Sequence, residues 1–224
     1  MHSRRRHRRR YNLELFDKSV LPRGGVVCIV GDKCTGKSSL AFQFSESSYQ
    51  PGDSVTLFDH RLVDPRYPQK FTNFLHFDSW NRQFVYQVLK EQDLSLKLKK
   101  GRHEPTRANN RIFVVEETLI NDAFFKDPMV QDIFVNGRRL GVTLVLCTQS
   151  IRNISADFCL HIDLFTMTGA KSTFERRNLY LRCGGCILGD GDYKKFERFL
   201  KENTRGNKVL LYSQYPTRMY CSCG

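Results

Sequence analysis

An apolar run that passes directly into a glycine-containing turn constrains this chain most. Residues 26–30 (VVCIV) are uniformly apolar, and residues 31–38 (GDKCTGKS) fit the pattern G-x-x-x-x-G-K-[ST]. A continuous apolar run of this length is typical of a strand buried on both faces in a parallel sheet. The glycines let backbone N–H groups surround a phosphate, and the amino end of the following helix adds positive potential. We therefore expect a strand, a phosphate-binding loop and a helix in succession.

The side chains of this turn have distinct expected roles. Lys37 would reach the β- and γ-phosphates of a nucleotide, and the Ser38 hydroxyl would coordinate Mg²⁺. The residues expected to contact the nucleotide are Gly31, Asp32, Lys33, Cys34, Thr35, Gly36, Lys37, Ser38 and Ser39. ATP and Mg²⁺ are accordingly the predicted cofactors, and an ordinary glycine turn is the alternative.

The rest of the chain alternates short apolar runs with segments of helical periodicity. Strands are expected at residues 26–30, 54–58, 75–77, 112–115, 142–147, 160–166 and 208–212, and helices near 38–48, 80–98, 128–140, 172–181 and 192–203. Asp127 would cap the third of these helices, and Gly141 would end it. Because the strands are apolar throughout and alternate with helices, we expect an α/β fold in which helices sandwich a mostly parallel sheet.

Charge is distributed between an amino-terminal arm and the body of the chain. Residues 1–10 hold six arginines and no hydrophobe beyond Met1, so we expect a disordered arm that binds nucleic acid or targets the nucleus. Residues 11–224 are expected to form one domain. The 36 Lys and Arg exceed the 23 Asp and Glu, giving a net charge of +13 that favours a polyanionic partner. No apolar run approaches 18 residues, so no transmembrane segment is expected.

Two glutamates follow another predicted strand. In residues 112–117 (IFVVEE) the strand would place Glu116 near Mg²⁺, and Glu117 would polarise the attacking water as a general base. This segment resembles a Walker B segment, in which the first acid is more often Asp. Because Glu116 is one methylene longer, we expect it to hold Mg²⁺ through water. The alternative is a strand end that carries two solvated acids.

The strand at residues 142–147 is followed by Thr148 and Gln149. This amide would lie at the same edge of the sheet as the two earlier motifs. There Gln149 would sense the γ-phosphate or orient water, because an amide both donates and accepts hydrogen bonds.

An arginine pair precedes that strand. Arg138 and Arg139 cannot easily fold back to their own nucleotide, but they would reach that of a neighbouring subunit as an arginine finger. A solvated basic helix end that offsets the helix dipole is the alternative. Arg138 is the first candidate, followed by Arg139 and then by Arg176 and Arg177.

These motifs together resemble those of the FtsK/HerA superfamily of P-loop ATPases. More narrowly, they resemble the genome-packaging ATPases of nucleocytoplasmic large DNA viruses and of their virophage and transposon relatives. The matching segments are GDKCTGKS, IFVVEE, VNGRR and GVTLVLCTQ, which lie within residues 24–165, and the closing KVLLY. The resemblance implies a RecA-like fold, a homo-oligomeric ring (pentamer or hexamer) with nucleotide sites at subunit interfaces, and translocation of double-stranded DNA. It further implies that Lys37 and Ser38 bind Mg-ATP, that Glu117 is the catalytic base and that Gln149 is the sensor.

The expected function is therefore an ATPase motor that moves a viral genome into a preformed capsid. Its partners would be double-stranded DNA and a capsid or portal component. It would act in the virion or at a viral assembly site in the host cytoplasm, and the Arg-rich arm also allows a nuclear location. A motor that ignores sequence would contact the DNA backbone rather than base edges. Candidate contacts are Lys97, Lys99, Lys100, Arg102 and Arg107, with a solvated loop as the alternative.

Two other functions remain open on the sequence. One is a nucleoside monophosphate kinase, which would transfer phosphate to a monophosphate rather than to water. The other is a non-catalytic basic virion protein that only binds nucleic acid. Separately, a four-thiolate zinc site is weighed below ordinary reduced thiols. It would use Cys183, Cys186, Cys221 and Cys223.

Overall fold

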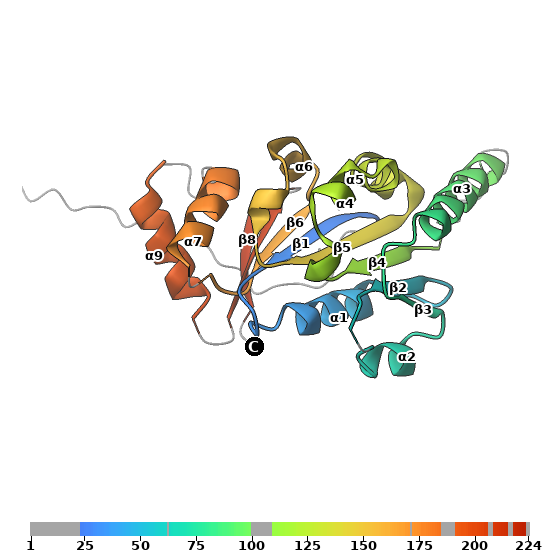
Figure 1. Cartoon of the computed structure of the whole chain (residues 1–224), viewed down its shortest axis with the longest axis horizontal. Helices are drawn as coiled ribbons and strands as arrows, with labels where there is room; N and C mark the ends of the chain where they lie inside the picture. The colour runs from blue at the N-terminus through green and yellow to red at the C-terminus, as the bar shows by residue number, and fades with distance from the viewer. Residues whose placement is uncertain are drawn as a thin grey trace, which may run out of the picture.

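In the part of the chain that is described, eight strands form one sheet with the order β3-β2-β4-β5-β1-β6-β7-β8 (Figure 1). The computed structural model describes residues 23–61, 63–99, 109–170, 172–184, 191–205, 208–214 and 217–222. The predicted arm at residues 1–10 lies outside these ranges, as do Lys100, Arg102, Arg107, Cys186 and Cys223.

Most of the sheet is parallel. The strands are β1 (Gly25–Val30), β2 (Ser54–Phe58), β3 (Phe74–Phe77), β4 (Arg111–Val115), β5 (Val142–Thr148), β6 (Leu164–Met167), β7 (Val209–Gln214) and β8 (Thr217–Ser222). β1 to β6 pair in parallel, whereas β7 runs antiparallel to both β6 and β8. β1 lies between β5 and β6, so the loop that follows β1 emerges at the centre of the sheet.

Helices connect the parallel strands. They are α1 (Lys37–Ser48), α2 (Arg66–Lys70), α3 (Arg82–Lys99), α4 (Asp122–Lys126), α5 (Pro128–Leu140), α6 (Ala156–Leu160), α7 (Thr173–Leu179) and α9 (Tyr193–Asn203). A π-helical turn (Tyr180–Gly184) continues α7, and short 3-10 turns follow β4 (Glu117–Leu119) and β5 (Ile151–Asn153). None of the described helices has the length and apolar character that a membrane span requires.

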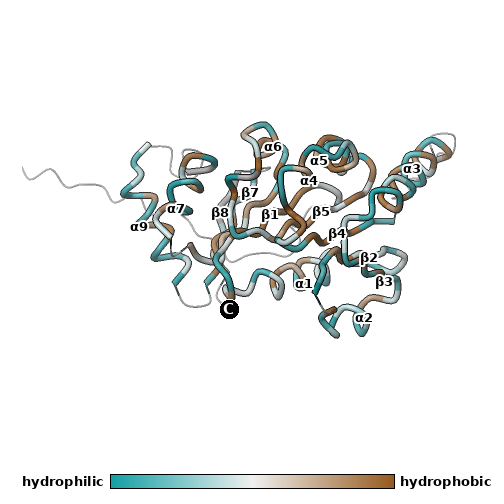
Figure 2. The backbone as a smooth tube through the Cα atoms, viewed as in Figure 1, coloured by the Kyte–Doolittle hydropathy of each residue, from teal (hydrophilic) through white to brown (hydrophobic). Residues whose placement is uncertain are grey.

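Alternate residues of β1 face two separate cores. Val26, Cys28 and Val30 belong to a cluster shared with α3 to α7 and α9, whereas Val27 and Ile29 pack with α1 and α2. Figure 1 accordingly shows α1 and α2 on one side of the sheet and α4 to α6 on the other, and Figure 2 shows hydrophobic residues concentrated on the central strands. Because both faces are covered, the strands must be apolar throughout, as the sequence indicated. The predicted sandwich around a mostly parallel sheet is confirmed.

The predicted helix at residues 128–140 is confirmed together with both of its ends. The Asp127 carboxylate accepts a hydrogen bond from the Met129 N–H at 2.7 Å, and Pro128 occupies the first turn. Gly141 follows with φ 65°, a left-handed conformation that ends the helix. Local capping chemistry therefore sets both ends of this helix, and its buried face packs on the sheet.

Two strand predictions are wrong in part. The strand expected at residues 160–166 begins only at Leu164, because Ser155 caps a helix that runs to Leu160 and the Asp163 carboxylate accepts from the Val26 N–H instead. The strand expected at residues 208–212 is not the last one, because β8 follows it as the outer member of a hairpin. β8 is an edge strand that pairs with β7 alone, so its sequence lacks the continuous apolar run of the central strands.

Candidate nucleotide-binding site

The loop between β1 and α1 has the backbone of a phosphate cradle. Gly36 is the N-cap of α1 with φ 88°, and Cys34 has φ 62°, so the chain turns twice through the left-handed region. A side chain at Gly31 would come within 2.0 Å of the Thr168 hydroxyl, so only glycine fits there. No acidic residue lies in the first turn of α1, which leaves the positive end of the helix uncompensated. The predicted strand, loop and helix are thus arranged for an anion.

The end of β6 fixes the far side of this loop. The Thr35 hydroxyl lies 2.7 Å from the Thr168 hydroxyl and donates to the Asp32 carbonyl at 2.7 Å. The Asp32 N–H donates to the Gly169 carbonyl at 3.0 Å. These contacts fasten the loop to the end of β6.

Lys37 lies buried under the loop, with 8% of its surface exposed. Its ammonium donates to the carbonyls of Gly31 and Asp32, each at 2.9 Å. It also lies 4.0 Å from a carboxylate oxygen of Glu117. A cation positioned in this way would be available to a phosphate in the cradle.

Glu117 and Gln149 come together beside Lys37. Glu117 follows β4 in a 3-10 turn, and Gln149 follows β5, which is the strand next to β4. The Gln149 amide donates to the Glu117 carboxylate at 2.7 Å. Because adjacent parallel strands end at the same edge, three segments distant in sequence place an acid, an amide and an ammonium within one site.

Glu116 lies deeper than its neighbour. Only 4% of its surface is exposed, and burial raises the pKa of its carboxyl group above the usual value of 4.5. A hydrogen bond with the Ser38 hydroxyl and the charge of Arg61 act in the opposite direction. The hydroxyl and the carboxylate are the oxygen ligands that Mg²⁺ prefers, and they already contact each other, so this donor set fits the predicted metal site.

Two residues of the site were missed from the sequence. Asp59 and Arg61 follow β2, the other neighbour of β4, and the Arg61 guanidinium lies 3.0 Å from the Glu116 carboxylate. Arg61 also donates through Nε to both oxygens of Asp59 at 3.0 Å. The available signal was positional, since a polar pair directly after a predicted parallel strand belongs to the same edge as the glutamates.

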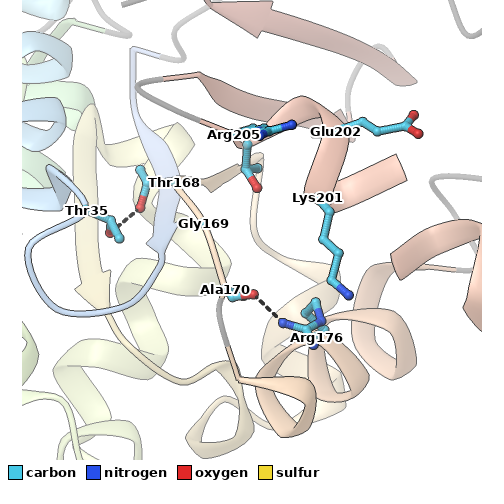
Figure 3. A pocket seen from close by; sticks show the side chains of 9 residues that line it. Thr35, Thr168, Gly169, Ala170, Arg176, Lys201, Glu202 and Arg205 are labelled. Atoms are coloured by element: carbon cyan, nitrogen blue, oxygen red, sulfur yellow. Dashed lines mark hydrogen bonds between the residues drawn. The ribbon is translucent and has the colours of Figure 1, made fainter. Parts of the chain in front are cut away.

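A pocket of about 780 Å³ opens beside the loop on the β6 side (Figure 3), whereas Glu117 follows β4, which lies on the other side of β1. It is lined by Thr35, Thr168, Gly169, Ala170, Arg176, Lys201, Glu202, Thr204 and Arg205. The loop and the end of β6 form one wall, and α7 with the end of α9 forms the other. Among its charged lining residues, the three cations Arg176, Lys201 and Arg205 outnumber the single acid Glu202.

Arg138 does not join the site of its own chain. It lies in the last turn of α5 against Gly24, at the amino end of β1, and forms an ion pair with Asp163. The six residues of β1, ~20 Å of strand, separate this edge of the sheet from the phosphate loop. Its side chain is 59% exposed, so a neighbouring molecule has access to it.

Arg176, a lower-ranked candidate for the arginine finger, is held by hydrogen bonds within its own chain. Its guanidinium is buried and donates to Glu197 at 2.8 Å, to the Ala170 carbonyl at 2.9 Å and to the Thr173 hydroxyl at 2.9 Å. These bonds tie α7 to α9 and to the end of β6. Arg176 therefore forms a wall of the pocket rather than a projecting finger.

Comparison with solved structures identifies the architecture. The genome-packaging NTPase B204 of Sulfolobus turreted icosahedral virus 2, solved with AMPPCP, superposes with a TM-score of 0.58 at 18% identity, covering 88% of this chain and 96% of that one. B204 of Sulfolobus turreted icosahedral virus, a DNA-packaging ATPase, gives 0.58 at 16% identity over 90% and 97%. The conjugation coupling protein TcpA of pCW3 gives 0.56 at 12% identity over 90% and 60%.

The fold is that of a RecA-like P-loop NTPase. The resemblance to genome-packaging ATPases that the motifs suggested is thereby confirmed at the level of the fold. Neither a search of family models nor a search of curated proteins gives a match to this sequence.

Two other predictions fall on parts of the chain that are not described. The zinc site needs Cys186 and Cys223, which lie outside the described residues. Of the DNA contacts expected near residues 97–107, Lys97 pairs with Asp93 at 2.7 Å on α3, and most of the others lie outside the described ranges. Both predictions therefore stay predictions.

Proposed function

We propose that this chain is an ATPase that translocates double-stranded DNA and packages a viral genome. The observation that carries this proposal is the grouping of Lys37, Glu117 and Gln149, with the Glu117 carboxylate 2.7 Å from the amide and 4.0 Å from the ammonium. A carboxylate beside the phosphate loop suits hydrolysis, because it can take a proton from water. The similarity to two viral genome-packaging ATPases supports the choice of substrate and cargo.

In this proposal water attacks the γ-phosphorus of ATP, and the bond to the bridging oxygen of ADP breaks. Glu117 accepts the proton of the attacking water, and the Gln149 amide holds the carboxylate in position. Lys37 moves from the loop carbonyls to the β- and γ-phosphates and stabilises the charge that develops there. Ser38 and Glu116 would hold Mg²⁺, which neutralises phosphate charge when bound. The products are ADP and inorganic phosphate.

The pocket beside Thr35 would receive the remainder of the nucleotide. The triphosphate would occupy the cradle with its terminal phosphate toward Glu117, so the ribose and base would extend in the opposite direction, where the pocket lies. Its hydroxyl and backbone groups provide polar partners for a sugar and a base.

A ring of identical subunits would complete the site. Arg138 is exposed at the edge of the sheet opposite its own phosphate loop. In a head-to-tail ring it would reach the nucleotide of the next subunit and act as an arginine finger. The capsid or portal partner and a location in the virion or at an assembly site belong to the same proposal.

Helix α9 offers a surface for the DNA backbone. Lys194, Arg198 and Lys201 recur at intervals of four and three residues, so they share one side of the helix, and all three are exposed. The other side is buried through Phe196 and Leu200. A row of exposed cations would contact phosphates without reading sequence, as a packaging motor requires.

The decisive experiment compares Glu117→Gln with the wild-type chain. Phosphate release should fall by about 10²- to 10⁴-fold, while ATP still binds in a calorimetric titration, because a glutamine oxygen can still accept from Gln149. Glu91→Gln, an exposed acid on α3, is the matched control and should leave hydrolysis unchanged. Double-stranded DNA should stimulate the wild-type rate. A hydrolysis rate that does not change when double-stranded DNA is added, together with no salt-sensitive DNA binding, would overturn the proposal that the chain is a DNA motor.

A nucleoside monophosphate kinase is the competing enzyme. It has no use for a carboxylate that activates water, which is the role proposed for Glu117, whose carboxylate accepts from the Gln149 amide. Incubation with ATP and a mixture of nucleoside monophosphates separates the two, since a kinase would form diphosphates and a hydrolase would release phosphate.

A further inference from the structure

Arg61 is bound to two buried carboxylates at the edge of the sheet that holds the phosphate loop. Its guanidinium lies 2.9 Å from Asp59 and 3.0 Å from Glu116, and Nε makes two further hydrogen bonds to Asp59 at 3.0 Å. Asp59 and Glu116 are 6% and 4% exposed, whereas the Arg61 side chain is 54% exposed. One partly exposed cation therefore neutralises two acids that water can hardly reach.

The two acids hold Arg61 differently. Asp59 engages it through both carboxylate oxygens and also accepts from its backbone N–H at 3.1 Å. Glu116 contacts a single terminal nitrogen, and the hydrogen bonds to Asp59 are the main cause of the raised pKa of Arg61. The bond to Glu116 can thus break while the guanidinium stays attached to Asp59.

Glu116 is also the carboxylate that contacts Ser38. A buried carboxylate needs a counter-charge, and removing the cation that pairs with it without replacement is costly. Arg61 and a divalent cation at Ser38 would therefore compete for the same oxygens, and the arrival of the metal ion would replace the charge that Arg61 supplies.

We propose that Arg61 is the counter-ion of Glu116 as long as no metal ion is bound, and that Glu116 exchanges Arg61 for Mg²⁺ when Mg-ATP binds. Asp59 keeps the released guanidinium beside the site. This inference rests on the proposed function, since it takes Ser38 and Glu116 as the Mg²⁺ site. It makes Arg61 a positioning residue that sets how strongly nucleotide binding depends on Mg²⁺.

The test measures AMPPCP affinity by calorimetry with saturating Mg²⁺ and with EDTA, and takes the ratio of the two affinities. In Arg61→Gln the competing cation is gone, so the ratio should rise about threefold to tenfold. Arg61→Lys, which keeps the positive charge, should stay close to the wild-type ratio. Arg82→Gln is the matched control, because Arg82 is an exposed arginine that pairs with Asp127, the N-cap of α5.

A second measurement requires no nucleotide. Arg61→Gln leaves Asp59 and Glu116 without their cation, so its melting temperature should fall and Mg²⁺ should restore part of the loss, whereas the wild-type chain should respond little to Mg²⁺. In a Glu116→Gln background, Arg61→Gln should no longer change the affinity ratio, because the group for which the two cations compete is neutral.

The outcomes separate the two proposals. A ratio that is unchanged or lower in Arg61→Gln, or that rises equally in the Glu116→Gln background, overturns the role of Arg61 and leaves the proposed function standing. A wild-type chain whose AMPPCP affinity ignores Mg²⁺ overturns both.

Discussion

Buried acids lie at both ends of the parallel strands. Those at the amino ends of the strands (the amino edge) and those at the carboxyl ends (the carboxyl edge) are held in different ways. At the amino edge, Asp53 is 1% exposed and accepts from the backbone N–H groups of Gln50 at 2.8 Å and Asn110 at 2.7 Å, as well as from Arg23 at 3.0 Å. At the carboxyl edge, Glu116 is held by the side chains of Ser38 and Arg61. Asp53 therefore links two backbone segments, whereas Glu116 is held by side chains that can change rotamer.

This difference separates structural from functional burial of charge. A carboxylate bound by backbone amides cannot be released unless the strands that carry those amides separate. A carboxylate bound by side chains can exchange them for a ligand at the cost of two rotamer changes. Asp163 shows an intermediate case, since it accepts from the Val26 N–H at 2.8 Å and also pairs with the exposed Arg138.

The largest expected effect tests whether the amino edge is purely structural. If Arg138 acts on a neighbour's nucleotide, Arg138→Ala should lower phosphate release by about 10³-fold or more without loss of ATP binding. A mixture of Arg138→Ala and Lys37→Ala subunits should regain part of the activity, because some interfaces then pair an intact Lys37 with an intact Arg138. Size-exclusion chromatography establishes that the mixed subunits assemble.

Asp163→Asn is the control for this first prediction. It weakens the same ion pair while its side-chain oxygen can still accept from Val26, so hydrolysis should persist. Equal losses in Arg138→Ala and Asp163→Asn, with no recovery on mixing, would mean that the ion pair only supports the fold.

The next effect compares the stability contributions of the two buried acids. Asp53→Ala leaves two backbone donors and Arg23 without their acceptor, and should lower the free energy of unfolding by about 3 kcal/mol. Glu116→Gln keeps the shape of the side chain and removes a charge that burial disfavours, so its loss should stay below about 1 kcal/mol. Urea unfolding of both variants measures the difference, and equal losses would erase the distinction between the edges.

A smaller effect concerns the exposed cations of α9, which contrast with the buried, hydrogen-bonded Arg176 of α7. The double variant Lys194→Glu/Arg198→Glu should weaken binding of double-stranded DNA by about tenfold and reduce its salt dependence, since fewer counterions are released. Lys90→Glu/Lys126→Glu changes the net charge equally on α3 and α4. If both variants weaken DNA binding to the same extent, net charge rather than the α9 surface is responsible.

The smallest effect is a pH dependence of stability at the carboxyl edge. Burial raises the pKa of Glu116 in the folded chain above its usual 4.5. A group whose pKa is raised by folding stabilises the fold below its unfolded pKa, and this contribution is lost as pH rises through the folded value. Glu116→Gln should therefore lose less stability than the wild-type chain between pH 4.5 and pH 7. Parallel urea curves at the two pH values would contradict this.

Much of the site followed from local pattern. Lys37 and Ser38 are fixed by the loop sequence, and Glu117 and Gln149 each follow an apolar strand whose direction in a parallel sheet is set, so their meeting could be predicted. Asp59 and Arg61 follow a strand in the same way, yet no spacing rule marks the segment DHR as part of a phosphate site. The same limit hid β8, whose pairing with β7 depends on an edge that sequence periodicity does not reveal.

The sequence by itself determined the central strands, the phosphate loop and the caps of α5, because each depends on residues within a few positions of one another. Only the tertiary structure decided which charges neutralise which. The bond of Arg61 to Glu116, that of Arg138 to Asp163 and that of Arg176 to Glu197 each join elements far apart in the chain. The physical reason is that a long cationic side chain can reach several acids, and the packing of helices on the sheet selects one.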